Sequence, residues 1–365
     1  METRLANRLL RELLEWDEQQ EGSYANILQT LAEWKWDTYE GFRAGSRFME
    51  SLARWLAQFP DPAARMRWIE FVAERLVFVS RAELDHAIAS VYYDVVRRDV
   101  IDRVAARMDA PRFANRTIVE SSGFRAEQRR ILVLALSDGA RLDILRRSSS
   151  GLSHEQFFPS VEIADDKADD LRDKLSQALS HFGSDALAQF NHVLLVDDFY
   201  GSGTSLIDTD DTGQMKGKAR KFQNTAAKLV ERGALAADYK VTLVLYIASA
   251  AARTHIESQI DSLGLRERWS LRVVQTLPST ARVERAELLD DCDWFWDPVL
   301  EDGHKKSAAR GYKDSALPLV LFHNTPNNSV SPLWADSAGR TLAGATSLNR
   351  RALFPRYERH HSDRP

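Results

Sequence analysis

The chain has 365 residues, of which 44% are hydrophobic and 28% charged, and a formal net charge of −4. This length and composition are ordinary for a globular protein with a sizeable core, in one large domain or two unequal ones. The slightly acidic balance argues against a general nucleic-acid binder, which needs a basic surplus, but leaves a local patch open. Four arginines near one loop are candidates for such a patch: Arg130, Arg141, Arg146 and Arg147.

Compartment and membrane contact are also constrained. The single cysteine, Cys292, excludes an intrachain disulfide, which suits a reducing cytoplasm. Its acidic neighbours in DDCDW are expected to raise the thiol pKa, which disfavours a catalytic thiolate. The first residues are charged and amphipathic, unlike a signal peptide, and the longest apolar run, 241–252, is too short to span a bilayer. We therefore expect a cytoplasmic protein without membrane contact.

The first third of the chain is predicted to be helical, because its leucine and aromatic residues recur at helical spacing. One helix ends at Phe59-Pro60, the next opens at Asp61-Pro62, and a long one covers 83–108. The Trp and Tyr residues of this region are either core or a partner surface, and core is the commoner outcome. Ala110-Pro111 marks the boundary, so we expect a helical region at 1–110 and a second domain at 111–365.

After this boundary, continuous apolar runs alternate with helical stretches. The runs are typical of strands buried on both faces of a sheet, and they cover 130–136, 191–196, 240–248 and 270–276. The helical stretches cover 165–179, 217–232 and 250–263. This alternation predicts an α/β fold with a parallel, doubly wound sheet. A late apolar strand at 317–322 precedes a turn-rich tail, and His304 to Lys306 form a basic spot expected at the solvated surface.

The run 194–205, LLVDDFYGSGTS, carries the clearest chemical signal. In open α/β sheets the ligand lies at the carboxyl ends of the strands. Gly201 and Gly203 allow backbone N–H groups to converge on an anion, and Ser202, Thr204 and Ser205 add hydroxyl donors. A helix N-terminus just after the loop would favour a phosphate further. Asp197 and Asp198 are placed to accept hydrogen bonds from two sugar hydroxyls, so the loop is interpreted as a cradle for ribose 5-phosphate.

Two other interpretations compete with this one. An ordinary Asp-Asp turn with a Gly-rich connection would need no ligand. A P-loop does not fit, because the lysine of GxxxxGK[ST] is missing.

In this region the sequence resembles the type I phosphoribosyltransferases. Their signature is an aliphatic run, two acidic residues, three variable positions and Thr/Ser-Gly-x-Thr/Ser, matched here by Asp197, Asp198, Ser202, Gly203 and Ser205. The resemblance implies that Asp197 and Asp198 are catalytic and contact the ribose hydroxyls of phosphoribosyl diphosphate (PRPP). It also implies that the loop from Gly201 to Ser205, Thr204 included, holds the 5-phosphate. Mg²⁺ would accompany PRPP and contact the acidic pair, directly or indirectly.

A second loop, Ser137-Asp138-Gly139-Ala140-Arg141, also follows a buried strand. It resembles the diphosphate-binding loop of the same enzymes in position. Backbone N–H groups around Gly139 would hold diphosphate oxygens and Arg141 would neutralise them. Asp138 is unusual near an anion unless it acts through a metal, and an ordinary strand-to-helix turn is the alternative. The span 148–159 corresponds to the mobile lid of catalytic relatives, although a plain loop also explains it.

The third feature is the polar turn at Asn324, Asn327 and Asn328, with LFPR near the end of the chain. The amides could form an acceptor or base pocket, or the residues could simply favour a turn. Together with the central motif, over roughly 130–356, they resemble the PRTase-CE group. Those proteins are linked to bacterial conflict and antiphage defence, some of them beside retron reverse transcriptases. The helical first third matches no motif.

The resemblance implies an effector that binds PRPP with Mg²⁺ and transfers or hydrolyses its ribose phosphate group. Whether the chain is an enzyme stays open, because the same pocket could serve a catalytically silent PRPP or nucleotide sensor. The acceptor is not identified. A regulatory protein partner, in a retron or other defence complex, is expected to dock on the N-terminal helices by family analogy.

Overall fold

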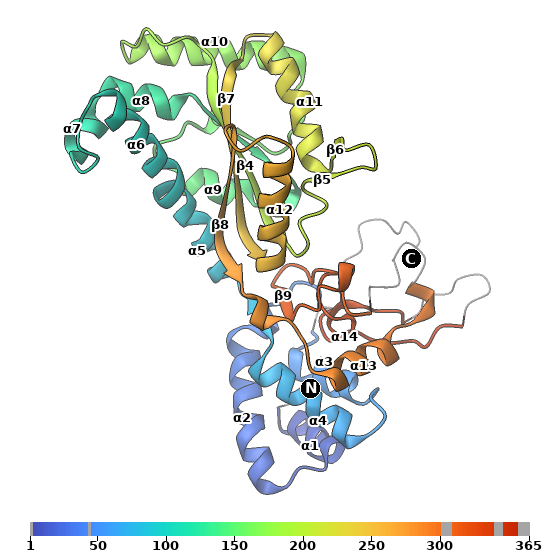
Figure 1. Ribbon diagram of the computed structural model, residues 1–365. Helices are drawn as coiled ribbons and strands as arrows, with labels where there is room; N and C mark the ends of the chain where they lie inside the picture. Colours follow the sequence, from blue (N-terminus) through green and yellow to red (C-terminus); the bar gives the residue numbers. More distant parts are fainter. Residues whose placement is uncertain (1–2, 43–44, 301–308, 339–345, 357–365) are drawn as a thin grey trace. The chain divides into compact units, whose positions relative to one another are not determined.

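The computed structural model describes residues 3–42, 45–300, 309–338 and 346–356 (Figure 1). Contacts group residues 84–277 into one unit, here the sheet unit. They group residues 1–83 with 278–365 into a second, here the helical unit. This grouping differs from the boundary expected at 110/111, because the C-terminal segment packs with the N-terminal helices. The basic spot at His304 to Lys306 lies outside the described residues.

The sheet unit is built on five parallel strands in the order β3-β2-β4-β7-β8. Their bounds are β2 Ile131–Ala135, β3 Phe157–Phe158, β4 Phe190–Tyr200, β7 Leu235–Ser249 and β8 Trp269–Leu277. The four apolar runs are therefore confirmed as strands. The edge strand β3 was not predicted: it lies in the span compared with a mobile lid, yet it pairs with β2 and Phe157 is buried.

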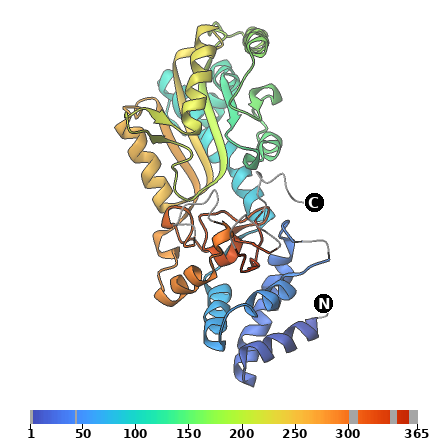
Figure 2. The same ribbon diagram turned by 90° about the vertical axis from the view of Figure 1, so that its right-hand side faces the viewer.

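Helices cover both faces of this sheet, which confirms the doubly wound fold (Figures 1 and 2). On one face, apolar residues of α10, α11 and α12 pack against alternate strand residues such as Leu195 and Leu243. On the other face lie α5 and α6, and Arg103 of α6 contacts His192 at the start of β4. The helices of the unit are α5 Arg81–Val91, α6 Arg98–Arg107, α7 Asn115–Glu120, α8 Ser122–Arg129, α9 Leu142–Ser148, α10 Asp165–His181, α11 Lys218–Glu231 and α12 Ala250–Ser262.

The helix predicted over 83–108 is present, with one irregularity. A π-helical segment, Tyr92–Arg97, joins α5 to α6. Its Tyr92 is buried and accepts a hydrogen bond of 2.8 Å from the Gln128 side chain of α8. The wider π turn thus places a tyrosine against a neighbouring helix.

The helical unit contains α1 Thr3–Leu14, α2 Glu18–Trp34, α3 Phe48–Leu56, α4 Pro62–Glu74, α13 Ala286–Phe295 and α14 Ser331–Trp334. As predicted, Asp61 caps α4 through the Ala64 N–H at 2.8 Å, and Pro62 occupies its first turn. The apolar strand predicted at 317–322 is β9, Leu319–Leu321. It pairs in parallel with β1, Val77–Val79, and not with the main sheet.

Most aromatic residues of the N-terminal third are core, as expected. The buried Trp and Tyr residues are Trp16, Trp36, Tyr39, Trp55, Trp68 and Tyr92. Trp55 donates from its indole to the Pro332 carbonyl at 2.9 Å, so part of this core is closed by the C-terminal segment. Trp34, with 77% of its surface exposed, and Tyr93 are the exceptions.

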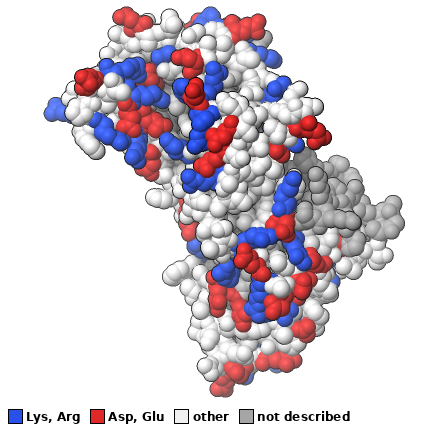
Figure 3. Space-filling view, in the orientation of Figure 1, with Lys and Arg blue, Asp and Glu red and all other residues white. Residues whose placement is uncertain are grey.

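The structure bears on three further expectations, which concern the thiol of Cys292, a basic surface patch and membrane-spanning helices. Cys292 is fully buried, and burial, assisted by Asp293 and Asp291, raises the pKa of its thiol well above the usual value. Basic and acidic side chains are intermixed over the face in Figure 3, without an extended basic surface there. In the described part of the chain, no helix has the length and apolarity needed to cross a membrane.

Candidate functional site

The strand order places a topological switch point between β2 and β4. Chain connections leave these two neighbouring strands toward opposite sides of the sheet, and ligands of doubly wound folds bind at the carboxyl ends of such strands. The register pairs Ala135, two residues before the loop at Ser137, with Val196, directly before Asp197. Parallel pairing therefore brings Ser137 to Arg141 beside the acidic pair and the Gly-rich loop.

Asp197 is the buried member of the acidic pair, with 1% of its surface exposed. Its Oδ1 accepts hydrogen bonds from Ser137 Oγ and from the Asp198 N–H, and its Oδ2 accepts from Tyr200 Oη at 2.6 Å. Lys218 Nζ lies 2.7 Å from the same Oδ2. A carboxylate has about four lone-pair directions, so these donors occupy the acceptor capacity of Asp197.

The electrostatics of Asp197 reflect this burial. Desolvation, followed by repulsion from Asp198, raises the pKa of its carboxyl, and Lys218 and Ser137 oppose the rise. Burial and the two carboxylates also raise the pKa values of Tyr200 and Tyr246 well above the usual range. Both phenols therefore stay protonated and serve as hydrogen-bond donors.

Asp198 is in a different position. It is partly exposed, and its Oδ1 accepts the Phe199 N–H at 2.8 Å. A Cβ placed on Gly139 would lie 2.3 Å from Asp198 Oδ2, so any larger residue at that position would force the Asp198 carboxylate to move. The two sequence motifs thus meet at Asp198, and the acidic pair divides into one anchored carboxylate and one that faces the loops.

The Gly-rich loop presents a row of backbone donors. Within the described residues, the N–H groups of Ser202, Gly203, Thr204 and Ser205 make no hydrogen bond. Consecutive unpaired N–H groups in a tight turn form an anion-binding concavity. The hydroxyls of Ser202 and Thr204 lie 3.1 Å apart beside it.

Packing against α12 holds this loop in place. Gly203 has φ +79°, and a Cβ there would lie 3.0 Å from the Ala252 carbonyl oxygen and 3.0 Å from Ile256 Cγ1. Ser249 donates from Oγ to the Gly201 carbonyl at 2.6 Å and also caps α12. The loop conformation is therefore dictated by glycine and by a helix that follows the neighbouring strand.

The expected helix N-terminus does not follow the loop directly. A small hairpin, β5 Asp208–Thr209 and β6 Met215–Lys216, is inserted first, and α11 begins after it. The N–H groups of Lys218 and Ala219 then bond to the carbonyls of Ser205 and Leu206, at 3.1 and 2.8 Å. The helix start thus returns to the loop, but these two first-turn donors are used by the protein itself.

Lys218 was not predicted as a site residue. It lies 20 positions after Asp198 in sequence, beyond the hairpin, and nothing in its local pattern distinguishes it from the neighbouring Lys216 and Lys221. Tyr200 was also missed, although it stands within the motif, and Tyr246 of β7 donates to the Ala140 carbonyl at 2.9 Å. A tyrosine two residues after the acidic pair was the one available signal.

The predicted arginine patch is not assembled as expected. Arg141 lies in the second loop with φ +43°, a left-handed conformation that is uncommon outside glycine. Arg147 pairs with Asp143 on the same short helix. Arg130 lies at the opposite end of β2, where it contacts the Gln189 carbonyl and Glu127, so the idea that it belongs to this loop is wrong.

The Asn-rich turn belongs to the helical unit, whereas the two loops belong to the sheet unit. Asn328 is buried, and its amide donates to Ser315 Oγ at 3.0 Å and to the Tyr312 carbonyl at 3.3 Å. Asn324 closes a turn through its backbone with Leu321, and the Asn327 carbonyl accepts the Tyr312 N–H. These contacts agree with the turn interpretation, and an acceptor-binding role of these residues stays a prediction.

The donor set limits how Mg²⁺ could be held. In the described part of the chain, no group of three or more acidic, His or Cys side chains could enclose a metal. Mg²⁺ commonly uses one or two carboxylates together with substrate phosphates and water. The oxygens of Asp197 are occupied by protein donors. The residues present would therefore suit an Mg²⁺ ion that arrives bound to a phosphate ligand and is contacted by Asp198.

Comparisons with known proteins bear on the same region. No curated protein and no solved structure matches the chain. The family model named PRTase-CE matches residues 52–356, which includes both loops, the Asn-rich turn and also α4 to α6 of the first third, where no motif was recognised. Since this match covers most of the sequence, the chain belongs to the PRTase-CE family, a phosphoribosyltransferase-like family.

Proposed function

We propose that the protein binds PRPP with Mg²⁺ at the switch point between β2 and β4 and transfers or hydrolyses its ribose phosphate group. One observation carries this proposal: two loops lie together at this edge of the sheet. The first offers four unoccupied N–H groups, Ser202 to Ser205, and the second contacts Asp198. A 5-phosphate and a diphosphate are the two anionic ends of PRPP, and the loops offer one place for each. Membership of the PRTase-CE family supports the same ligand.

In this proposal the residues have separate roles. The N–H groups of 202–205 bind the 5-phosphate, with the loop hydroxyls as further donors. Asp198 accepts hydrogen bonds from the ribose hydroxyls, while Asp197 acts as a positioning residue that holds Ser137 and Lys218. Gly139 and Arg141 contact the diphosphate, with Asp138 beside them. Bound Mg²⁺ would add positive charge at the diphosphate and ribose oxygens.

The reaction needs little beyond this arrangement. The bond between C1 and the diphosphate oxygen breaks, and its electron pair leaves with diphosphate, while a base nitrogen or water forms the new bond to C1 and gives up its proton to the departing diphosphate or to solvent. Asp198 would stabilise the positive charge that develops on the ribose ring, and Arg141 the charge of the leaving group. Positioning supplies most of the remaining effect.

One observation favours the alternative of a silent PRPP or nucleotide sensor. Lys218 and two hydroxyl donors neutralise and occupy Asp197, so only one carboxylate remains to face a cationic ring. Such a site binds an anion well, but it stabilises a positively charged transition state less than a site with two free carboxylates would. Binding without turnover would then report ligand level to a partner.

The test separates binding from chemistry. Calorimetry with PRPP and Mg²⁺ measures binding, and release of labelled diphosphate, with and without cell extract, measures turnover. Asp198→Asn should abolish turnover, whereas Asp173→Asn, a change of an acid with a 68% exposed side chain on α10, should not. Binding without diphosphate release under any condition would support the sensor, and absence of PRPP binding would refute both.

We also propose that the protein acts in bacterial antiphage defence, held in check by a protein partner on its N-terminal helices. Ile27 and Trp34, seven residues apart and thus on one face of α2, are exposed, as is Leu5 of α1. Apolar side chains exposed together mark interaction surfaces. Plaque assays with Asp198→Asn test the defence role, and co-purification of the chain and its Trp34→Glu variant from the native host tests the partner.

A further inference from the structure

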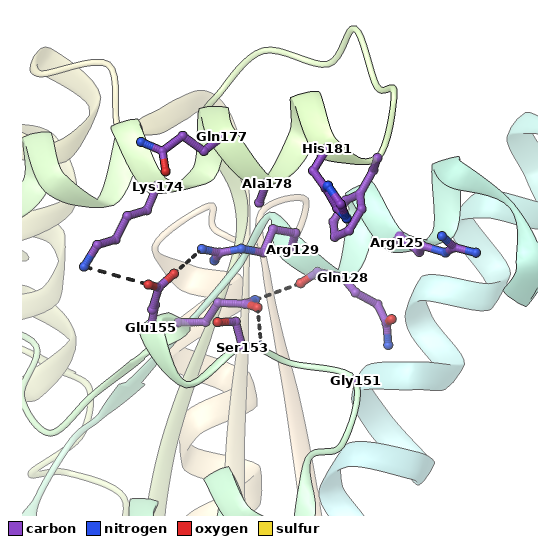
Figure 4. Close-up of a pocket in the computed structure, with 12 residues that line it drawn as sticks. Arg125, Gln128, Arg129, Gly151, Ser153, Glu155, Lys174, Gln177, Ala178 and His181 are labelled. Atoms are coloured by element: carbon purple, nitrogen blue, oxygen red, sulfur yellow. Dashed lines mark hydrogen bonds and ion pairs between the residues drawn. The ribbon is translucent and has the colours of Figure 1, made fainter.

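The sheet unit contains a cavity of about 490 Å³ that neither loop of the proposed PRPP site lines. Helix α8, the 151–156 segment and α10 enclose it (Figure 4). Its wall is fixed to the start of β2, because Gln156 donates from Nε2 to the Ile131 carbonyl at 2.7 Å. The PRPP loops follow the other end of that five-residue strand, about 13 Å away at the usual rise per residue.

Arg129 is the central feature of this cavity. Its side chain is only 8% exposed, and one guanidinium nitrogen, Nη2, donates to Glu155 Oε2 at 2.7 Å. The other, Nη1, is buried and has no hydrogen-bond partner within the described ranges. Burial lowers the pKa of this guanidinium, a sign that its charge is poorly compensated. A buried donor of a charged group without an acceptor is costly, so this position favours a ligand oxygen.

The charges around Arg129 favour an anion. Arg125 and Lys174 also line the cavity, and Glu155 is the single acidic residue among its lining side chains. Glu155 is itself shared between Arg129 and Lys174, the latter at 3.8 Å, and Lys174 also pairs with Asp170 at 3.2 Å, so two carboxylates face three cations. Figure 4 shows Lys174 and His181 on α10 across from the arginines of α8. The wall thus carries a positive surplus in a chain that is negative overall.

The size and remaining lining indicate the class of ligand. Pockets of a few hundred cubic ångströms and upward accommodate ligands of nucleotide size. Ala178 and Phe182 supply apolar surface beside the cations, and Gln177 supplies an amide. We propose that this cavity binds the phosphate of a nucleotide-sized phosphate monoester at Arg129, Arg125 and Lys174, as a second ligand site separate from the PRPP loops. This inference does not depend on the proposed transferase or sensor function.

Gly151 is a tightly packed part of the cavity wall. A Cβ on Gly151 would lie 1.9 Å from Tyr92 Oη and 2.6 Å from Gln128 Nε2. The segment therefore passes tightly over the tyrosine that the π-helical turn directs inward. A larger residue at this position would force the Tyr92 or Gln128 side chain, or the segment itself, to move.

The test is calorimetry on the full chain with AMP, and with inorganic phosphate as the smaller probe. The double variant Arg125→Met/Lys174→Met removes the two less buried cations and should weaken AMP binding at least about tenfold, as expected for lost charge-assisted contacts. Arg116→Met, a 90% exposed arginine on α7, is the matched charge control and should bind as the wild type does. AMP should bind more tightly than phosphate.

Asp198→Ala distinguishes this site from the PRPP loops. Retained AMP binding in that variant, with loss in the double variant, supports the second site. AMP binding lost in Asp198→Ala and kept in the double variant would place the ligand in the switch-point loop and overturn the proposal. So would absence of binding at millimolar AMP, equal weakening by Arg116→Met, or equal affinity for phosphate and AMP.

Discussion

Replacing Gly203 by alanine tests the loop geometry most directly, because the chain offers a matched control. Gly203 and Gly213 have φ +79° and +78°. Alanine at either position must therefore adopt the left-handed conformation, which costs about 1–2 kcal/mol. At Gly213 a new Cβ has nothing within 4 Å, whereas at Gly203 it meets Ala252 O and Ile256 Cγ1 at 3.0 Å. Overpacking of this kind adds about 1–3 kcal/mol.

We therefore expect Gly203→Ala to lower the free energy of unfolding by about 2–5 kcal/mol and Gly213→Ala by about 1–2 kcal/mol. Urea denaturation of both variants measures the difference. Relief of the contact must move the loop and misalign its N–H groups, and loss of one charge-assisted hydrogen bond weakens PRPP binding about tenfold to a hundredfold. Equal stability of the two variants would refute the packing argument, and unchanged PRPP affinity in Gly203→Ala would refute the assignment of the phosphate loop.

Three further changes probe the electrostatics and anchoring of the sheet unit. Lys218→Met should destabilise the fold by about 1–3 kcal/mol at pH 8. This is less than the cost of breaking a fully buried ion pair, because the Lys218 side chain is about a third exposed. The loss should shrink as pH falls and Asp197 takes up a proton, and should vanish in an Asp197→Asn background, as urea denaturation at two pH values would show. Burial and a neighbouring arginine lower the pKa of His192 to about 3. Because the folded pKa lies below the unfolded one, this histidine stabilises the fold above about pH 6.5, and its contribution falls by about 1.4 kcal/mol per pH unit below that. His192→Asn should remove this dependence of stability on pH. If the variant loses stability in acid as the wild type does, the lowered pKa of His192 is contradicted. Tyr246→Phe removes one hydrogen bond to the second loop and should cost about 1 kcal/mol, with weaker diphosphate binding and an unchanged 5-phosphate affinity.

Local pattern was enough to determine the strands and the first loop. The residues directly before the two loops, 131–136 and 193–196, are apolar at every position, as burial on both faces of a sheet requires, and both stretches lie in or directly after a central strand. The motif from Asp197 to Ser205 is contiguous, so its residues stay together in any fold that ends a strand there. The helices α10, α11 and α12 also lie within two residues of their predicted bounds.

Tertiary structure decided everything that depends on residues far apart in the chain. The strand order brought Gly139 against Asp198 and placed Arg130 at the opposite end of β2. In sequence, however, Arg130 is much nearer to Gly139 than Asp198 is. Lys218 reached Asp197 only because a hairpin returns the chain to the loop, and the residues after Leu277 joined the N-terminal helices. Hydrophobic periodicity reports which face of an element is buried but not which element covers it. The sequence therefore determined the Gly-rich loop that we propose binds the 5-phosphate, while the anchored state of Asp197 and the cavity beside Arg129 arose from packing between distant segments.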